Sequence, residues 1–86
     1  MEIKQKFSIR EIAGEYFLIP EGQSAMDLNS MITTNDVGVS IWQALPFVSS
    51  EEELVSRILQ EYEADENDVK KDVHEFVECL HRLGIL

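Results

Sequence analysis

The sequence has little of what marks several common protein classes. It contains one cysteine, which excludes an internal disulfide and fits a reducing compartment. No apolar run approaches the roughly 20 residues of a membrane-spanning helix. The first residues, MEIKQKF, carry no signal-peptide core, so we expect a cytoplasmic protein that does not associate with membranes. Repeats and low-complexity segments are also missing, and 86 residues predict a single domain, residues 1–86, with one modest core.

Basic residues are scarce as well. Seven lysines and arginines stand against 17 aspartates and glutamates, which gives a formal net charge of −10. A chain with this balance repels nucleic-acid backbones and anionic membranes unless its basic residues are segregated into a patch. Here they are scattered along the chain, so we expect no nucleic-acid partner.

The side chains that carry enzyme chemistry do not form a recognisable arrangement. No nucleophile lies beside a base, and there is no phosphate-binding loop or cofactor fingerprint. Cys79 and His81 are two positions apart on a predicted helix and point about 200° apart, so they cannot share a metal ion. We therefore expect no catalytic residue, metal or cofactor, and a protein that is not an enzyme.

The first third of the chain reads as strands. Lys6–Ile12 and Glu15–Pro20 have strand-like patterns on either side of Ala13-Gly14, which predicts a hairpin. Ala25–Leu28 is again extended, and a turn after it would pair this segment with a further strand, Met31–Thr34.

A helix follows the last strand directly. Asn35 is a good N-cap, and Pro46 cannot continue a helix, so the two bound it. Apolar residues recur every four positions and define one buried face: Val37, Ile41 and Leu45. Trp42 lies beside them and is expected to pack in the core, whereas for Met31 the core and a binding groove remain equal alternatives.

Two more helices complete the chain. Ser50 and Glu53 have capping-box spacing and predict a helix start, and Glu66–Leu83 predicts the last helix, with Gly84 as its C-terminal cap. The expected seam of this last helix consists of Val69, Val73, Phe76, Leu80 and Leu83, widened on one flank by Val77 and Lys70, with His74 and His81 further round. The predicted fold is α+β, a small N-terminal three-stranded antiparallel sheet followed by three helices, similar in outline to a winged helix-turn-helix.

The order of these motifs resembles the PqqD-like family, also called the RiPP recognition element. The resemblance is carried by the hairpin FSIREIAGEYFLIP, by the strand that ends at Thr34-Asn35 and leads to Ile41-Trp42, and by the helix start Ser50–Val55. The closing helix, DVKKDVHEFVECLHRLGIL, extends the resemblance over nearly the full length.

The resemblance implies a peptide-binding function. Such proteins bind the leader segment of a ribosomally made precursor peptide as an added strand, and they present it to a separate modifying enzyme: a radical S-adenosylmethionine enzyme, a cyclase or a protease. The leader lies on the third strand's edge beside the last helix, and because leaders in this family commonly carry acidic residues, a basic rim is expected. The expected peptide-binding residues are Met31, Ile32, Thr33, Thr34, Lys70, Val73, His74 and Val77. Ser24–Ser30 lengthens the hairpin before the binding strand, which leaves Ala25–Leu28 as the alternative exposed edge.

Two other functions remain as alternatives. The helix order permits a winged-helix DNA-binding regulator, although that would require a basic recognition helix. The chain is otherwise a non-catalytic scaffold or dimerising subunit of an enzyme complex, because an open strand edge also pairs two copies, and its state would be a monomer or an edge-paired dimer.

Overall fold

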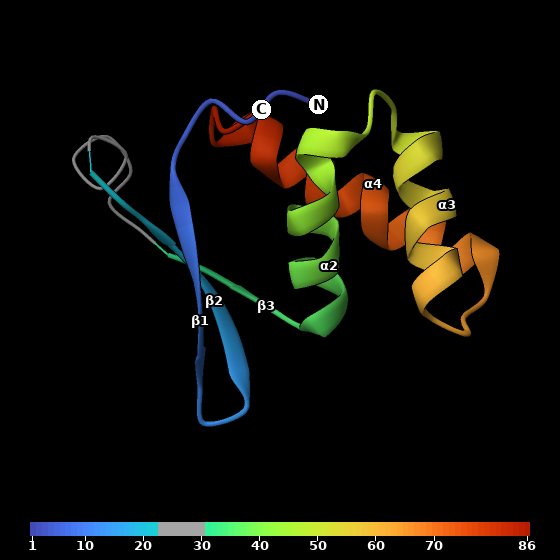
Figure 1. The fold of residues 1–86 in the computed structure, drawn as a ribbon, viewed down its shortest axis with the longest axis horizontal. Helices are drawn as coiled ribbons and strands as arrows, with labels where there is room; N and C mark the ends of the chain where they lie inside the picture. The colour runs from blue at the N-terminus through green and yellow to red at the C-terminus, as the bar shows by residue number, and fades with distance from the viewer. Residues whose placement is uncertain (23–30) are drawn as a thin grey trace.

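The computed structural model describes residues 1–22 and 31–86 and places a sheet before the helices (Figure 1). The strands, joined in the order β1-β2-β3, are β1 (Phe7–Ile12), β2 (Glu15–Pro20) and β3 (Ile32–Thr34). The helices that follow are α2 (Asp36–Ala44), the short 3₁₀ helix η1 (Leu45–Phe47), α3 (Glu51–Glu61) and α4 (Glu66–Arg82). The predicted α+β order, an antiparallel sheet followed by three α-helices, is confirmed.

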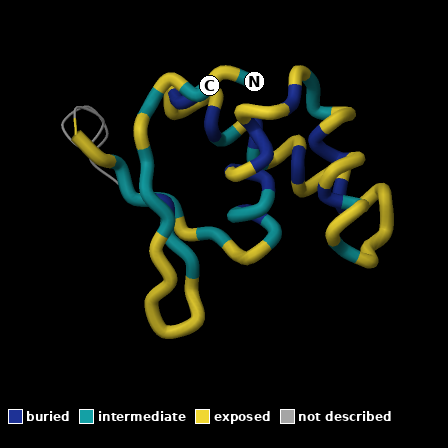
Figure 2. Tube along the Cα trace, viewed as in Figure 1, coloured by how far each residue is buried: buried dark blue, intermediate teal, exposed yellow. Residues whose placement is uncertain are grey.

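A tight turn joins β1 to β2. Ala13 and Gly14 have φ angles of 51° and 82°, the left-handed values that a two-residue type I′ turn requires at both central positions. The turn aligns Ile12 with Glu15 and fixes the register as far as Phe7 opposite Pro20. This hairpin extends away from the helices, and its tip is exposed (Figure 2).

β3 pairs with the central strand on one side. Its register runs from Leu18 opposite Ile32 to Tyr16 opposite Thr34. The predicted pairing of Ala25–Leu28 with this strand lies outside the described residues. Within residues 1–22 and 31–86, no strand pairs with the other side of β3 or with the outer side of β1.

Each α-helix begins at a polar cap, and the caps at Asn35 and Ser50 are the predicted ones. The side-chain oxygens of Asn35 and Ser50 accept from the backbone N–H groups of Gly38 and Glu53, at 2.9 and 3.2 Å. Asp65 accepts in the same way from the N–H groups of the first turn of α4. Asn35 therefore fixes the point at which β3 turns into α2.

The end of α4 is closed by a Schellman motif. Gly84, with φ 73°, donates to the carbonyl of His81 at 3.1 Å, and Ile85 donates to the carbonyl of Leu80 at 2.9 Å. The N–H of Lys4 then donates to the carbonyl of Ile85 at 2.7 Å. The two ends of the chain consequently lie side by side (Figure 1).

The core lies where the sheet, α2, α3 and α4 meet. Its largest fully buried side chains come from β2, from every helix and from the segment after α4: Leu18, Ile41, Leu45, Leu54, Ile58, Val73, Val77, Leu80 and Ile85. Trp42 is 8% exposed, and its ring packs edge-on against Phe7 of β1 with the centroids 5.5 Å apart. The prediction that Trp42 belongs to the core is confirmed.

Candidate functional site

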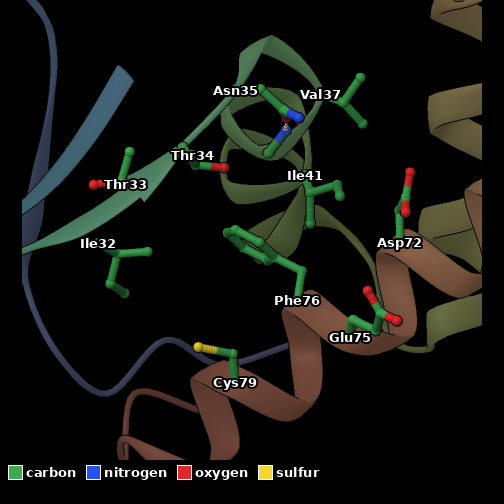
Figure 3. Close-up of a pocket in the computed structure, with 11 residues that line it drawn as sticks. Ile32, Thr33, Thr34, Asn35, Val37, Ile41, Asp72, Glu75, Phe76 and Cys79 are labelled. Atoms are coloured by element: carbon green, nitrogen blue, oxygen red, sulfur yellow. Dashed lines mark hydrogen bonds between the residues drawn. The ribbon is translucent and has the colours of Figure 1, made fainter. Parts of the chain in front are cut away.

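A groove of about 320 Å³ lies between β3, the first turns of α2 and one flank of α4 (Figure 3). Residues from these separate segments line it: Ile32, Thr33, Thr34, Asn35, Val37, Gly38, Ile41, Asp72, Glu75, Phe76 and Cys79. The groove thus has a strand as one wall, a helix as the other and α2 between them.

The hydrogen-bond phase of the sheet determines which backbone groups of β2 point toward which neighbour. The N–H of Glu21 donates to the carbonyl of Lys6 at 2.9 Å, so these residues form a hydrogen-bonded pair just beyond the ladder of β1 and β2. Hydrogen-bonded and non-hydrogen-bonded pairs alternate along an antiparallel ladder. Phe17 lies four positions before Glu21 and is therefore also a hydrogen-bonded residue. It directs its N–H and C=O toward β1.

The next strand takes its phase from β2. Because Phe17 faces β1, its neighbours Tyr16 and Leu18 direct their backbone groups toward β3, where their partners are Thr34 and Ile32. The N–H and C=O of Thr33 therefore face the outer edge of β3, beside the groove. No described residue pairs with this edge.

The start of α2 is in close contact with the end of β3. Gly38 is buried, and a β-carbon at this position would lie 1.7 Å from Oγ1 of Thr34 and 3.0 Å from Cβ of Thr34. Only glycine allows the strand to approach the helix so closely. The position of β3 relative to α2 and the groove thus depends on glycine at position 38.

The α4 wall has an apolar part and an acidic part. Phe76 and Cys79 are half-buried and point toward β3, whereas the carboxylates of Asp72 and Glu75 are exposed along the same wall (Figure 3). Phe76 follows Asp72 by four positions and precedes Cys79 by three, which places the three residues on one flank of the helix. The α4 wall of the groove therefore offers apolar surface near β3 and negative charge on its exposed part.

The predicted site residues divide between this groove and other places. Ile32, Thr33 and Thr34 line the groove, while Met31 is 57% exposed and does not line it. Val73 and Val77, which were also predicted to bind the peptide, are in the core, 0% and 1% exposed, and do not line the groove.

The residues expected to form a basic rim, Lys70 and His74, do not line this groove. Lys70 lies 3.7 Å from Glu66 of its own helix, and His74 lies 3.1 Å from Glu51 of α3. Both residues are on the flank of α4 that faces α3, on the other side of the core stripe from the groove. The groove rim carries Asp72 and Glu75 in their place.

The sequence pattern did not indicate which flank of α4 lines the groove, because this helix has more apolar positions than one face can bury. Val77 was placed beside the seam and Phe76 within it, but Val77 is buried and Phe76 is half-buried in the groove. Cys79 also lines the groove, although it was not among the predicted site residues. One available signal was Gly38, since a glycine in the first turns of a helix often marks close approach of another backbone.

His74 links α4 to α3 by a charge-sensitive contact. Its Nδ1 lies 3.1 Å from Oε2 of Glu51, and its Nε2 lies 3.8 Å from Oε1 of Glu78. The hydrogen bond with Glu51 raises the pKa of His74 above its ordinary value of 6.5, and the negative charge of Glu51 adds to this rise. The protonated form is thus favoured in the folded chain.

We expect an NMR titration of His74 to have its midpoint above pH 6.5, and the Glu51→Gln variant to lower it. A pKa raised by folding adds stability that is fully present below the unfolded pKa and is lost as pH rises through the folded pKa. The contact should therefore hold α3 to α4 more firmly at pH 5.5 than at pH 8, by a small amount because both side chains are solvated. Glu52→Gln removes an equal charge one residue away and should leave the midpoint unchanged; an equal shift in both variants would contradict the assignment to Glu51.

The described residues contain neither a membrane-spanning helix nor a cluster of metal ligands. No helix in the part of the chain that the structure describes is long and apolar enough to cross a membrane. Within the same residues, no group of three or more histidine, cysteine, aspartate or glutamate side chains could hold a metal ion.

Comparison with known proteins places the chain in a family. A family model described as Coenzyme PQQ synthesis protein D (PqqD) matches residues 15–86, so the chain belongs to the PqqD family. Among solved structures, TbiB1 in complex with the TbiA(beta) leader peptide is similar, with a TM-score of 0.68 and 26% sequence identity. The match covers 100% of this chain and 94% of that chain. None of the curated proteins matches.

Proposed function

We propose that this chain binds the leader segment of a ribosomally synthesised precursor peptide as an additional strand on β3. The observation that carries the proposal is the outer edge of β3, where the N–H and C=O of Thr33 face outward beside the groove. In strand addition, main-chain hydrogen bonds supply affinity and pockets for alternate side chains supply specificity. The edge and the groove together offer both.

The family and the fold support this proposal. The chain belongs to the PqqD family, and a protein similar to it over its whole length has been solved with a leader peptide bound. An unpaired edge strand is a hazard for aggregation unless it serves a partner. A leader strand on β3 would direct alternate side chains toward the half-buried Phe76 and Cys79, so we expect apolar residues at those positions of the leader.

We further propose that the chain presents the leader to a separate modifying enzyme and does not itself catalyse a reaction. The groove is lined by backbone, apolar side chains and two carboxylates, with no nucleophile paired to a base among its lining residues. A radical S-adenosylmethionine enzyme, a cyclase or a protease would then act on the bound precursor, in the cytoplasm where precursor peptides are made.

DNA binding is disfavoured by charge. Acidic residues outnumber basic ones on α4, which would be the recognition helix of a winged-helix regulator, and the groove side of this helix carries Asp72 and Glu75. A mobility-shift titration at low salt should show no tight binding of duplex DNA.

The direct test is an NMR titration of the ¹⁵N-labelled chain with the leader segment of the precursor peptide encoded beside its gene. We expect amide shifts in Ile32–Thr34 and in Asp72–Cys79, and slower alkylation of the Cys79 thiol in the complex. A scrambled leader of the same composition is the control. Shifts confined to the α3-facing flank would relocate the site, and no binding of the leader would refute the function.

Thr33→Pro should weaken leader binding more than it weakens the fold. Proline removes one backbone donor, and at Thr33 that donor faces the added strand and not β2. We expect the dissociation constant to rise by about tenfold, the value of one lost hydrogen bond of about 1.4 kcal/mol, with a smaller change in the free energy of unfolding. Thr33→Ala keeps the N–H and is the matched control. Equal losses of stability and binding would mean that Thr33 donates to β2.

A further inference from the structure

The groove is charged on one wall only, and this asymmetry bears on what it selects. Asp72 and Glu75 lie along the α4 wall, opposite the open edge of β3 (Figure 3). No lysine, arginine or histidine is among the residues that line the groove. A strand on β3 would lie with the side chains of one face toward these carboxylates.

The acidic residues of α4 differ in how they are partnered. Those on the α3-facing flank have basic neighbours, Glu66 with Lys70 at 3.7 Å and Glu78 with His74 at 3.8 Å. Among the described residues, neither Asp72 nor Glu75 forms an ion pair within 4.0 Å. These two carboxylates can consequently form ion pairs with a ligand that binds in the groove.

Both carboxylates are exposed in the free chain, and the chain carries a formal net charge of −10. An acidic peptide would be repelled at long range and would meet like charges in the groove, whereas a basic one would be attracted at both stages. Charge complementarity of this kind acts on specificity and association rate more than on raw affinity.

We infer that Asp72 and Glu75 are specificity-determining residues that select a leader with lysine or arginine on the side chains facing α4. The inference rests on the proposed function and adds the chemical class of the bound segment: apolar residues toward Phe76 and Cys79, and basic residues toward Asp72 and Glu75. A leader with acidic residues at these positions is rejected.

The test is a selection of displayed, randomised 15-residue peptides on the immobilised full chain. We expect the enriched sequences to combine apolar residues with lysine or arginine at fixed spacing, and to shift the amides of Ile32–Thr34 in the labelled chain. Enriched sequences that shift these amides but favour aspartate and glutamate, or show no charge preference, would overturn the inference and leave leader binding intact. No enrichment of a peptide that shifts these amides would overturn both.

A second measurement separates the groove from the overall charge. With an enriched basic peptide, Asp72→Asn combined with Glu75→Gln should raise the dissociation constant about three- to tenfold, as expected for two solvated ion pairs. Glu52→Gln combined with Glu61→Gln removes the same number of charges from α3 and should change it less than twofold. Equal losses in the two double variants would mean that the peptide is attracted by net charge alone, which would overturn the assignment to Asp72 and Glu75.

Discussion

Replacing Trp42 by alanine is expected to lower the free energy of unfolding by roughly 3–5 kcal/mol, the usual cost of removing a large buried aromatic side chain. Trp42 is 8% exposed and packs edge-on against Phe7, so its ring links α2 to β1. A domain of this size has a total stability of about 5–15 kcal/mol. The loss would therefore remove a large share of the stability of the fold.

Chemical denaturation of the unchanged chain and of the Trp42→Ala variant, followed by circular dichroism, measures this loss. Phe47→Ala is the matched control, because Phe47 is also aromatic but is 70% exposed, and its ring contacts only the Arg57 guanidinium at 5.8 Å among the ring and cation contacts of the described residues. Its removal should cost no more than about 1 kcal/mol. A similar cost for both variants would show that burial of the Trp42 ring contributes little to the free energy of unfolding.

Gly38→Ala should destabilise the chain, although alanine in place of glycine within a helix normally stabilises by about 1 kcal/mol. The added carbon would lie 1.7 Å from Oγ1 and 3.0 Å from Cβ of Thr34. Rotation of the Thr34 side chain can move Oγ1 away but not Cβ, so a tight contact with the backbone-linked carbon remains. The end of β3 must move away from α2. We expect a loss of about 1–3 kcal/mol, typical of overpacking, together with weaker leader binding.

A double-mutant cycle distinguishes this overlap from a general effect on the helix. Thr34→Ala removes Oγ1 and Cγ2 and leaves only Cβ near the new methyl group. Gly38→Ala should therefore cost less in the Thr34→Ala background than in the unchanged chain, with a coupling of about 0.5–3 kcal/mol measured by thermal melting. Additive effects of the two substitutions, or a gain in stability from Gly38→Ala alone, would contradict the close contact.

Local signals in the sequence predicted most of the fold. The Ala13-Gly14 turn, the caps at Asn35 and Ser50, and the glycine after α4 each act over a few residues, and the structure confirms all of them. Glu15–Pro20 was predicted with the bounds that the structure has. These features depend on turn and cap geometry, which neighbouring residues determine almost alone.

The α4 wall of the groove could not be predicted in the same way. Its apolar residues spread over more of the helix than the core covers, and periodicity alone does not say whether Phe76 or Val77 is the residue left at the side. The answer depends on how α4 packs against α3, which places Lys70 and His74 near α3 and turns Asp72 toward the groove. The charge of the groove rim follows from that packing.

Within residues 1–22 and 31–86 the outer sides of β1 and β3 are unpaired, and this affects how copies of the chain meet one another. The outer sides of β1 and β3 are different surfaces at opposite borders of one sheet, so pairing β1 of one copy with β3 of the next is a head-to-tail contact. Such a contact extends into an open-ended filament whenever its rotation does not close a ring, and a bare strand edge favours this kind of association. The excess of carboxylates supplies mutual repulsion between copies at neutral pH, and that protection fades as the medium approaches the isoelectric point near 4.4.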